Sequence, residues 1–494
     1  MAGWSRGYVA DSTYRIAFQM AQNPAHLALV CAMAGVDWPL RQRMRIADLG
    51  CGRGYAVNAL AAANPDWTVL GLDHNPVHVD EAMQFAARAG LGNALFLEAD
   101  LASLTEAELD RIGAFDVVML HGVWSWVSDA VRAGVVRFLR HCLKPGGVAY
   151  LGYNALPGAG ADLALQRLLR QLAGPPGRGP GQSEAAAAQA MARLREMAPA
   201  LPLQPSPLLT RLLAEPPVLE SAFVAHEFLT DYWRPVFQED LCAALLPAKL
   251  EFVGSCNLFE AMPALYCDAQ ELAVLDALPE GPPREFLKDL CLPRGFRADV
   301  FIRGARQLDP ATAQNAVLLA AAREWPAESP VLPTGRAQVA MQQEVWEALA
   351  AAMTEGPQSV GQLRRRIGPA APHPTELLSV LLGTELALPV HRALGREAAA
   401  TRFNRVAAAN YPPHGEGDGH FALASPVLAG GLPPRGPELA LAALLLDGAD
   451  PGDPLAAAER LRPGLDPEAR ERLAGRIAAL WVERIPVWQR FGVI

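Results

Sequence analysis

An apolar run that ends in an acidic residue and leads into alternating glycines constrains the fold of this chain more than any other feature. Residues 46–54 read Ile-Ala-Asp-Leu-Gly-Cys-Gly-Arg-Gly, a helical pattern follows at 55–63, and a second apolar run, 68–73, ends in another aspartate. The acidic and glycine positions of this pattern are Asp48, Gly50, Gly52, Gly54 and Asp73. Glycines at a strand-to-helix turn tolerate positive φ and let a ligand approach the backbone closely. The pattern predicts a ligand-binding turn of a doubly wound α/β sheet, with an ordinary glycine-rich turn as the alternative.

The spacing of these residues favours one kind of nucleotide ligand. A dinucleotide fingerprint requires Gly-x-Gly-x-x-Gly, but Tyr55 stands where its third glycine would be. The carboxylate of Asp73 suits the two hydroxyls of a ribose, and Asp48 suits a cationic ligand better than a pyrophosphate. We therefore expect S-adenosyl-L-methionine as the cofactor, with its amino-acid moiety held by the glycine loop. Asp100, after a third apolar run, is expected to contact the adenine amino group, and a helix N-cap is its alternative role.

Strand and helix patterns alternate between residues 45 and 153 at the spacing of a parallel sheet. We expect strands at 46–49, 68–73, 94–98, 115–120 and 148–153, and helices at 55–63, 76–89 and 130–142. The Gly/Pro-rich stretch 173–183 is interpreted as a mobile loop or linker. Residues 249–254 are expected to form a late strand of the same sheet after a helical insertion. Residues 305–338 are interpreted as connective, and three short helices at 344–353, 359–367 and 374–382 suggest a winged-helix-like module.

The composition of the chain argues against several kinds of binding partner and metal site. With 494 residues the chain is long enough for several domains, and its net charge of −9 argues against general nucleic-acid binding. No apolar run is long enough to span a bilayer, so we expect a soluble cytoplasmic protein without a membrane partner. The seven cysteines form no Cys-x-x-Cys pair, so neither a disulfide framework nor a zinc site is expected. The i,i+4 spacing of His74 and His78 would allow them to bind a metal, but we expect both to lie on a solvated surface instead. His226-Glu227 resembles a metal-binding fragment only superficially, because no second ligand is spaced for zinc.

The ends of the fourth and fifth strands are expected to border the transferred methyl group, because ligands lie beyond the carboxyl ends of parallel strands. The side chains expected there are His121, Trp124, Trp126, Tyr153 and Asn154. His121 is assigned to the cofactor, with a structural hydrogen bond as its alternative. Trp124 and Trp126 are assigned to a partly aromatic slot for an amine substrate, and packing against the following helix is the alternative for one of them.

The same segments resemble class I methyltransferases that carry a methyltransferase regulatory domain, a group that includes bacterial protein-lysine methyltransferases of the rickettsial outer-membrane-protein type. The resemblance rests on His121-Gly122-Val123-Trp124-Ser125-Trp126-Val127, Gly147-Val148-Ala149-Tyr150 and Tyr153-Asn154-Ala155-Leu156-Pro157-Gly158. In this group a tyrosine is usual at the position of Trp124, and an aromatic residue is usual at the position of Ala159. Both positions lie near the expected acceptor slot, so the acceptor can differ from that of the group even if the cofactor does not. A lysine acceptor is what the resemblance implies. On that basis Tyr153 and Asn154 are the expected catalytic residues, whose oxygen atoms accept the N–H bonds of the amine.

These observations predict a Rossmann-like methyltransferase sheet with a helical insertion and additional, mostly α-helical carboxyl-terminal domains. The expected divisions are a cofactor-binding domain at 1–172, a linker or insertion at 173–219, a regulatory domain at 220–304, a winged-helix-like domain at 339–435 and a helical tail at 436–494. The expected activity is methyl transfer to protein lysine. The alternatives are a small-molecule N- or O-methyltransferase and a non-catalytic, cofactor-binding regulatory protein. The expected partner is a protein or small-molecule methyl acceptor. A homodimer is compatible with the sequence.

Overall fold

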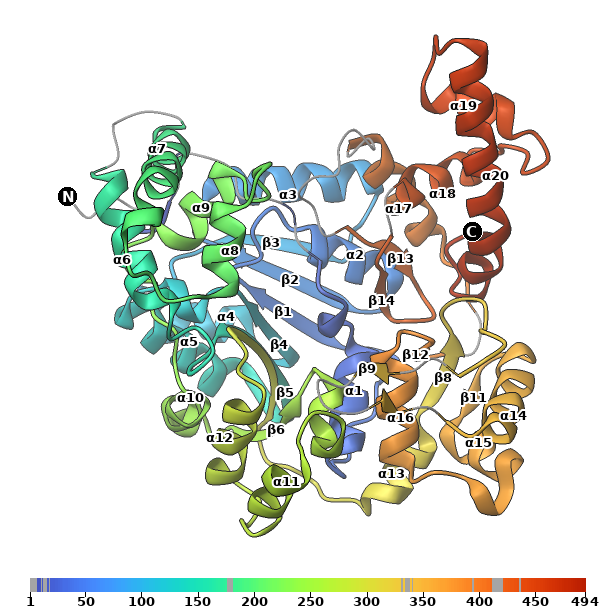
Figure 1. Ribbon diagram of the computed structural model, residues 1–494, viewed down its shortest axis with the longest axis horizontal. Helices are drawn as coiled ribbons and strands as arrows, with labels where there is room; N and C mark the ends of the chain where they lie inside the picture. The colour runs from blue at the N-terminus through green and yellow to red at the C-terminus, as the bar shows by residue number, and fades with distance from the viewer. Residues whose placement is uncertain are drawn as a thin grey trace.

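Seven strands form one sheet through the middle of the molecule, in the order β3-β2-β1-β4-β5-β7-β6 (Figure 1). The computed structural model describes residues 7–9, 11, 16, 18–175, 181–329, 332–333, 338–339, 341–392, 395–410, 421–434 and 437–494. The strands are β1 (Arg45–Leu49), β2 (Thr68–Asp73), β3 (Ala94–Glu98), β4 (Phe115–His121), β5 (Leu143–Asn154), β6 (Glu251–Ser255) and β7 (Phe296–Ile302). Strands β1 to β5 pair in parallel. This confirms the predicted doubly wound α/β sheet.

The strands are apolar runs because both faces of the sheet are covered. Successive residues alternate between two cores: Ile46 packs with the first and Ala47 with the second. The first core includes side chains of α2 (Tyr55–Ala63) and α3 (Pro76–Ala89), and the second includes those of α4 (Glu106–Ile112) and α5 (Asp129–Cys142). The predicted helices 55–63 and 76–89 are therefore confirmed, and helix 130–142 begins one residue earlier. Helix α3 is bounded by Asn75, whose side chain accepts from Val77 N, and by Gly90 in the left-handed region.

Strand β6 confirms the late strand expected at 249–254, and it joins the sheet through β7, which no sequence pattern indicated. Strand β7 pairs antiparallel with β5 on one side and with β6 on the other. It was missed because its sequence, Phe-Arg-Ala-Asp-Val-Phe-Ile, carries two charges that are both buried. The guanidinium of Arg297 lies 2.9 Å from Asp299 and 2.8 Å from Asp289 of α12 (Pro282–Cys291). A charged strand enters the core here because its charges are paired.

A helical insertion follows β5 and lies at the left of Figure 1. It comprises α6 (Asp162–Ala173), α7 (Gln182–Met197), α8 (Pro207–Leu213) and α9 (Ser221–Phe228), and α10 (Gln238–Leu245) and α11 (Ala269–Asp276) follow it. These first four helices share an apolar core with Trp126 and Trp233. Residues 176–180, within the predicted linker 173–183, lie outside the described residues.

The carboxyl-terminal half packs against α2 and α3. Its elements are α13 (Pro310–Ala316), β8 (Leu318–Ala321), α14 (Gln343–Thr354), β11 (Gln358–Ser359), α15 (Val360–Ile367), α16 (Pro374–Gly383), β12 (Ala387–Pro389), α17 (Ala398–Asn410), β13 (Leu423–Ser425), β14 (Gly430–Leu432), α18 (Glu438–Leu446), α19 (Pro454–Leu461) and α20 (Pro467–Arg490). A short pair, β9 (Leu332–Pro333) and β10 (Gln338–Val339), lies between β8 and α14. The prediction of connective structure at 305–338 is wrong, because β8 is the central strand of the sheet β11-β8-β12.

Helix α1 (Pro24–Met33), near the amino terminus, lies against β6 and β7, so the first and later segments of the chain pack together. Among the helices of the described segments, none has the length and apolarity that a bilayer span requires.

Candidate active site

The glycine turn between β1 and α2 adopts the left-handed conformation that its sequence predicts. Gly50, Gly52 and Gly54 have φ values of 75°, 52° and 71°. A Cβ on Gly50 would lie 2.4 Å from Val123 Cγ2, and one on Gly54 would lie 2.4 Å from Ala82 Cβ. Gly52 faces open space instead, and its N–H donates to Asp73 Oδ2 at 2.8 Å. Gly50 and Gly52 line cavities, whereas Gly54 lets α2 pack closely against α3 and does not line either of the two cavities described below.

Asp73 at the end of β2 is fixed by several contacts. It accepts from Gly52 N at 2.8 Å and from Asn75 N at 2.9 Å, and its Oδ1 lies 3.7 Å from His78 Nδ1. Burial works to raise the pKa of Asp73, but the contacts with His78, with the Asn75 N–H and with His74 together outweigh it, and the pKa is lowered. His78 is only 3% exposed, so the expectation that it is solvated is wrong, and His74 is partly exposed. An ionised carboxylate with a fixed orientation suits hydrogen bonding to a pair of hydroxyls.

A first cavity of about 140 Å³ opens beside this carboxylate at the carboxyl ends of the strands. Its wall contains five of the residues assigned to the cofactor: Gly50, Gly52, Asp73, Asp100 and His121. The N-cap alternative for Asp100 is wrong, because α4 begins at Glu106 and is capped by Thr105. Asp100 instead accepts from Ala102 N at 3.0 Å and faces the cavity. Tyr8 and His78 also line this cavity, although neither was predicted there.

A second cavity of about 290 Å³ adjoins the first, and Gly50, Gly52, His121, Gly122 and Trp126 line both. Its wall includes the carboxylates of Asp48 and Glu227. The aromatic side chains in the same wall are Tyr55, Trp126, Phe223 and Phe296. Phe223 and Glu227 come from α9 and Phe296 from β7, so three residues far along the chain complete a site that begins in the first glycine turn.

Asp48 lines the second cavity only, whereas His121 lines both cavities. Asp48 is 4% exposed, and burial, reinforced by the nearby charge of Asp73, raises its pKa to about 7. His121 Nδ1 lies 2.8 Å from the Tyr150 hydroxyl, and its ring centroid is 5.2 Å from that of Phe296. His121 therefore lines both cavities and also makes the structural hydrogen bond given as its alternative.

The two tryptophans have different surroundings. Trp126 lines both cavities, and its Nε1 donates to Glu227 O at 3.0 Å. Trp124 lines neither cavity and is buried in the second core, where the guanidinium of Arg132 lies 5.8 Å from its ring centroid. The packing alternative therefore applies to Trp124, and its assignment to the substrate slot is wrong.

Tyr153 and Asn154 do not occupy the expected acceptor position. The Tyr153 hydroxyl donates to Asp299 Oδ2 at 2.6 Å within the second core, because β5 directs this side chain toward β7. Burial raises the pKa of Tyr153 well above its usual range, with a further contribution from the charge of Asp299. Asn154 Oδ1 accepts from Trp233 Nε1 at 2.9 Å, and its amide donates to Gly295 O at 3.2 Å. Neither residue lines a described cavity, which contradicts the catalytic roles expected for them.

Comparison with known proteins identifies two regions of the chain. Residues 46–147 match the family model of a methyltransferase domain, and residues 220–303 match that of the predicted methyltransferase regulatory domain. An uncharacterised protein of Synechocystis sp. is 29% identical over 73% of this chain and 72% of its own length. A trans-aconitate 2-methyltransferase of Methylobacterium nodulans is 32% identical, but over only 28% of this chain and 47% of its own.

Solved structures share the fold over nearly the whole chain. PKMT2 of Rickettsia typhi, solved in complex with AdoHcy, superimposes with a TM-score of 0.71 at 16% identity, and the match covers 97% of this chain and 99% of that one. The sheet, the insertion and the carboxyl-terminal half are thus arranged as in that protein. The two domain matches identify an S-adenosyl-L-methionine-dependent methyltransferase domain at residues 46–147 and a methyltransferase regulatory domain at residues 220–303.

Proposed function

We propose that this methyltransferase transfers methyl groups to lysine side chains of a protein, and that the acceptor amine enters the cavity of about 290 Å³. One observation carries the proposal: the wall of that cavity combines two carboxylates, Asp48 and Glu227, with the aromatic rings of Trp126, Phe223 and Phe296. Aromatic faces and carboxylates attract ammonium and sulfonium groups. The wall thus suits both the cationic methyl donor and a cationic acceptor.

The reaction is an in-line displacement in which the protein positions the reactants and assists loss of a proton. A free lysine has a pKa of about 10.4, so its ammonium must lose a proton before nitrogen can attack. The aromatic wall lowers that pKa by removing water, and the carboxylate of Glu227 accepts the proton that the ammonium releases. The nitrogen lone pair then forms the new bond to the methyl carbon while the carbon–sulfur bond breaks and its electrons remain on sulfur. Glu227 thus takes the role first assigned to Tyr153 and Asn154.

The cofactor is assigned to the cavity of about 140 Å³ and to the wall that it shares with the acceptor cavity. Asp73 would hold the ribose hydroxyls, Asp100 the adenine amino group, and Gly50 and Gly52 the amino-acid moiety. Asp48 faces the acceptor cavity from the end of β1 and would balance the positive charge of the donor. This assignment places the sulfonium between the two cavities.

A small-molecule acceptor is the second candidate, and the match to trans-aconitate methyltransferases favours it. A tricarboxylate, however, would face Asp48 and Glu227 at close range. Arg53, the one guanidinium in the described cavity wall, is already paired with Glu81 at 2.5 Å. The charge of the wall therefore favours an amine over a carboxylate, whichever size of molecule carries it.

Labelled methyl transfer into cell extract tests the proposal directly. With the protein and radiolabelled cofactor, we expect label in protein, and mass spectrometry should find one added methylene or more on lysine-containing peptides. Glu227→Gln should lower turnover by about 10–100-fold while cofactor affinity changes little. The matched control is Glu239→Gln, because Glu239 is an exposed glutamate on α10. Label only in metabolites would support the second candidate, and no transfer despite cofactor binding would support the non-catalytic alternative.

A further inference from the structure

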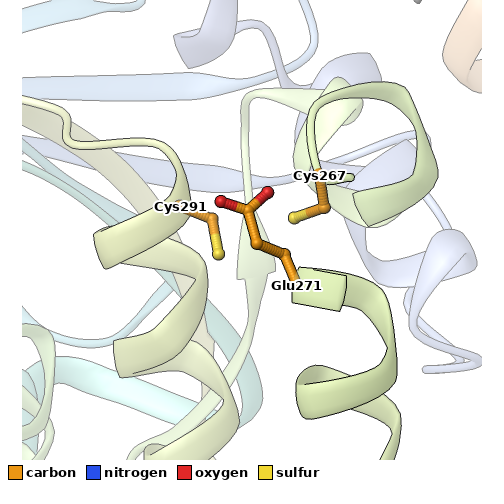
Figure 2. Close-up of side chains that lie close together, drawn as sticks. All are labelled: Cys267, Glu271 and Cys291. Atoms are coloured by element: carbon orange, nitrogen blue, oxygen red, sulfur yellow. The ribbon is translucent and has the colours of Figure 1, made fainter. Parts of the chain in front are cut away.

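Two cysteines and a glutamate meet between α11 and α12 (Figure 2), and none of the three lines either cavity described above. The Sγ atoms of Cys267 and Cys291 and a carboxylate oxygen of Glu271 all lie within 4.8 Å of one another. Figure 2 shows the Glu271 carboxylate lying between the two thiol groups. We propose that Cys267, Glu271 and Cys291 bind a zinc ion.

The donor set indicates which metal the site would take. Thiolate ligands select zinc over calcium or magnesium, and a carboxylate is an acceptable third ligand. In a tetrahedral site, ligand atoms lie about 3.6–3.8 Å apart, given metal–ligand distances of about 2.1–2.3 Å. The present separations need an inward shift of up to about 1 Å. A water molecule would complete four-coordination, since the described residues provide three ligands here.

Helix capping accounts for only part of this arrangement. Glu271 belongs to a capping box in which its Oε2 accepts from Asp268 N at 2.8 Å, which explains the position of one carboxylate oxygen. Capping does not require two thiols beside that carboxylate. Cys267 precedes the N-cap of α11, whereas Cys291 is the last residue of α12. In the described part of the chain, no other group of three potential ligands is this close.

A metal at this point would connect the beginning of α11 to the end of α12. Asp289, two residues before Cys291, accepts two hydrogen bonds of 2.8 Å from Arg297 and also pairs with Arg294. Arg297 lies in β7. The first residue of this strand, Phe296, lines the cavity of about 290 Å³. The proposed ion would therefore stabilise the helix that holds β7 in the sheet.

Metal titration of the full-length, reduced protein tests the proposal. Elemental analysis after dialysis against zinc and removal of excess should find one zinc per chain. Cobalt used as a spectroscopic substitute should give a thiolate-to-metal charge-transfer band. Calorimetry in buffers of different ionisation enthalpy should show release of about two protons per ion, because both thiols must ionise to bind.

Three variants distinguish the site from adventitious binding. Cys291→Ser should abolish the cobalt band, whereas Cys242→Ser on α10 should keep it. Glu271→Gln retains an acceptor for the capping box, so it should leave the melting temperature of the metal-free protein nearly unchanged while weakening zinc affinity at least about tenfold. Absence of stoichiometric zinc in the wild type, or equal uptake by Cys291→Ser, would overturn the proposal. So would loss of two thiols to a Cys267–Cys291 disulfide without any metal uptake.

Discussion

Residues 46–147 and 220–303 contribute to the same sheet and the same site, but their sequences encode these contributions differently. The first region forms strands that are apolar and pair in parallel, with turns marked by glycine and strand ends marked by Asp48 and Asp73. The second region supplies β6 and β7 at the antiparallel edge and places Phe223, Glu227 and Phe296 in the wall of the second cavity. The residues predicted to bind the cofactor are thus local in sequence, whereas the wall of the second cavity depends on contacts between distant segments.

The difference has a physical basis in how each region is stabilised. Burial of apolar side chains is non-directional and leaves a periodic pattern that can be recognised in a sequence. The second region depends more on directional contacts among buried charges, in which Arg297 pairs with Asp289, Asp299 and Glu285. Such pairs specify particular neighbours, and no periodic pattern reveals them.

The largest expected effect tests the buried charges of the second region. Arg297→Ala would leave Asp289 and Asp299 buried without their main cation, so the free energy of unfolding should fall by about 3–5 kcal/mol. Chemical denaturation monitored by circular dichroism measures this loss. Arg306→Ala is the matched control, because the Arg306 side chain is 83% exposed and should change stability by less than about 0.5 kcal/mol. Equal effects of the two variants would show that the second region is not held by its charged network.

An intermediate effect tests the first region through pH. With the pKa of Asp48 near 7, cofactor affinity should rise about tenfold from pH 6 to pH 8, because the ionised carboxylate attracts the cationic donor. Isothermal titration with S-adenosylmethionine measures this change. Asp48→Asn should remove the pH dependence and leave the affinity at the low-pH level. Asp66→Asn, at an exposed position after α2, should retain it.

The same group makes a linked prediction for the protein without cofactor. The folded state keeps the Asp48 proton up to pH 7, whereas the unfolded chain releases it near pH 3.9. Stability contributed by this group should therefore fall as pH rises from about 4 to about 7. Accordingly, Asp48→Asn should raise the melting temperature at pH 8, and a lowered melting temperature would contradict the raised pKa.

The smallest expected effect on catalysis tests the boundary between the two regions. Tyr153→Phe removes a hydroxyl that donates to Asp299 of β7, so unfolding should become easier by about 1–2 kcal/mol. Turnover below the melting temperature should stay within about twofold, because this hydroxyl faces away from both cavities. Trp126→Phe, at a residue that lines both, should lower turnover more. A large loss of turnover in Tyr153→Phe with unchanged stability would restore the catalytic role first expected for this tyrosine.

Much of the catalytic sheet could be predicted because buried parallel strands are apolar runs bounded by turn and cap residues such as Asn75 and Gly90. Strand β7 could not, since Arg297 and Asp299 enter the core only with the partners that α12 provides. At the site, the location of Asp48 and Asp73 could be predicted because each follows an apolar run that forms a strand. The contribution of Glu227 depended on a contact with Trp126 across 101 positions, and sequence pattern gives no direction for a side chain at such range.

Helix α2, which follows the glycine turn, is buried at all nine of its residues. Its outer side is covered by α17 and by β13 and β14, and the Tyr55 hydroxyl donates to Ala422 O at 2.7 Å across 367 positions. A ribosome builds α2 long before it builds this cover, because synthesis proceeds from the amino terminus. Until this cover is made, the nascent chain exposes the apolar outer side of the helix that follows the glycine turn. We therefore expect α2 to complete its packing only after the segment around Ala422 has been translated.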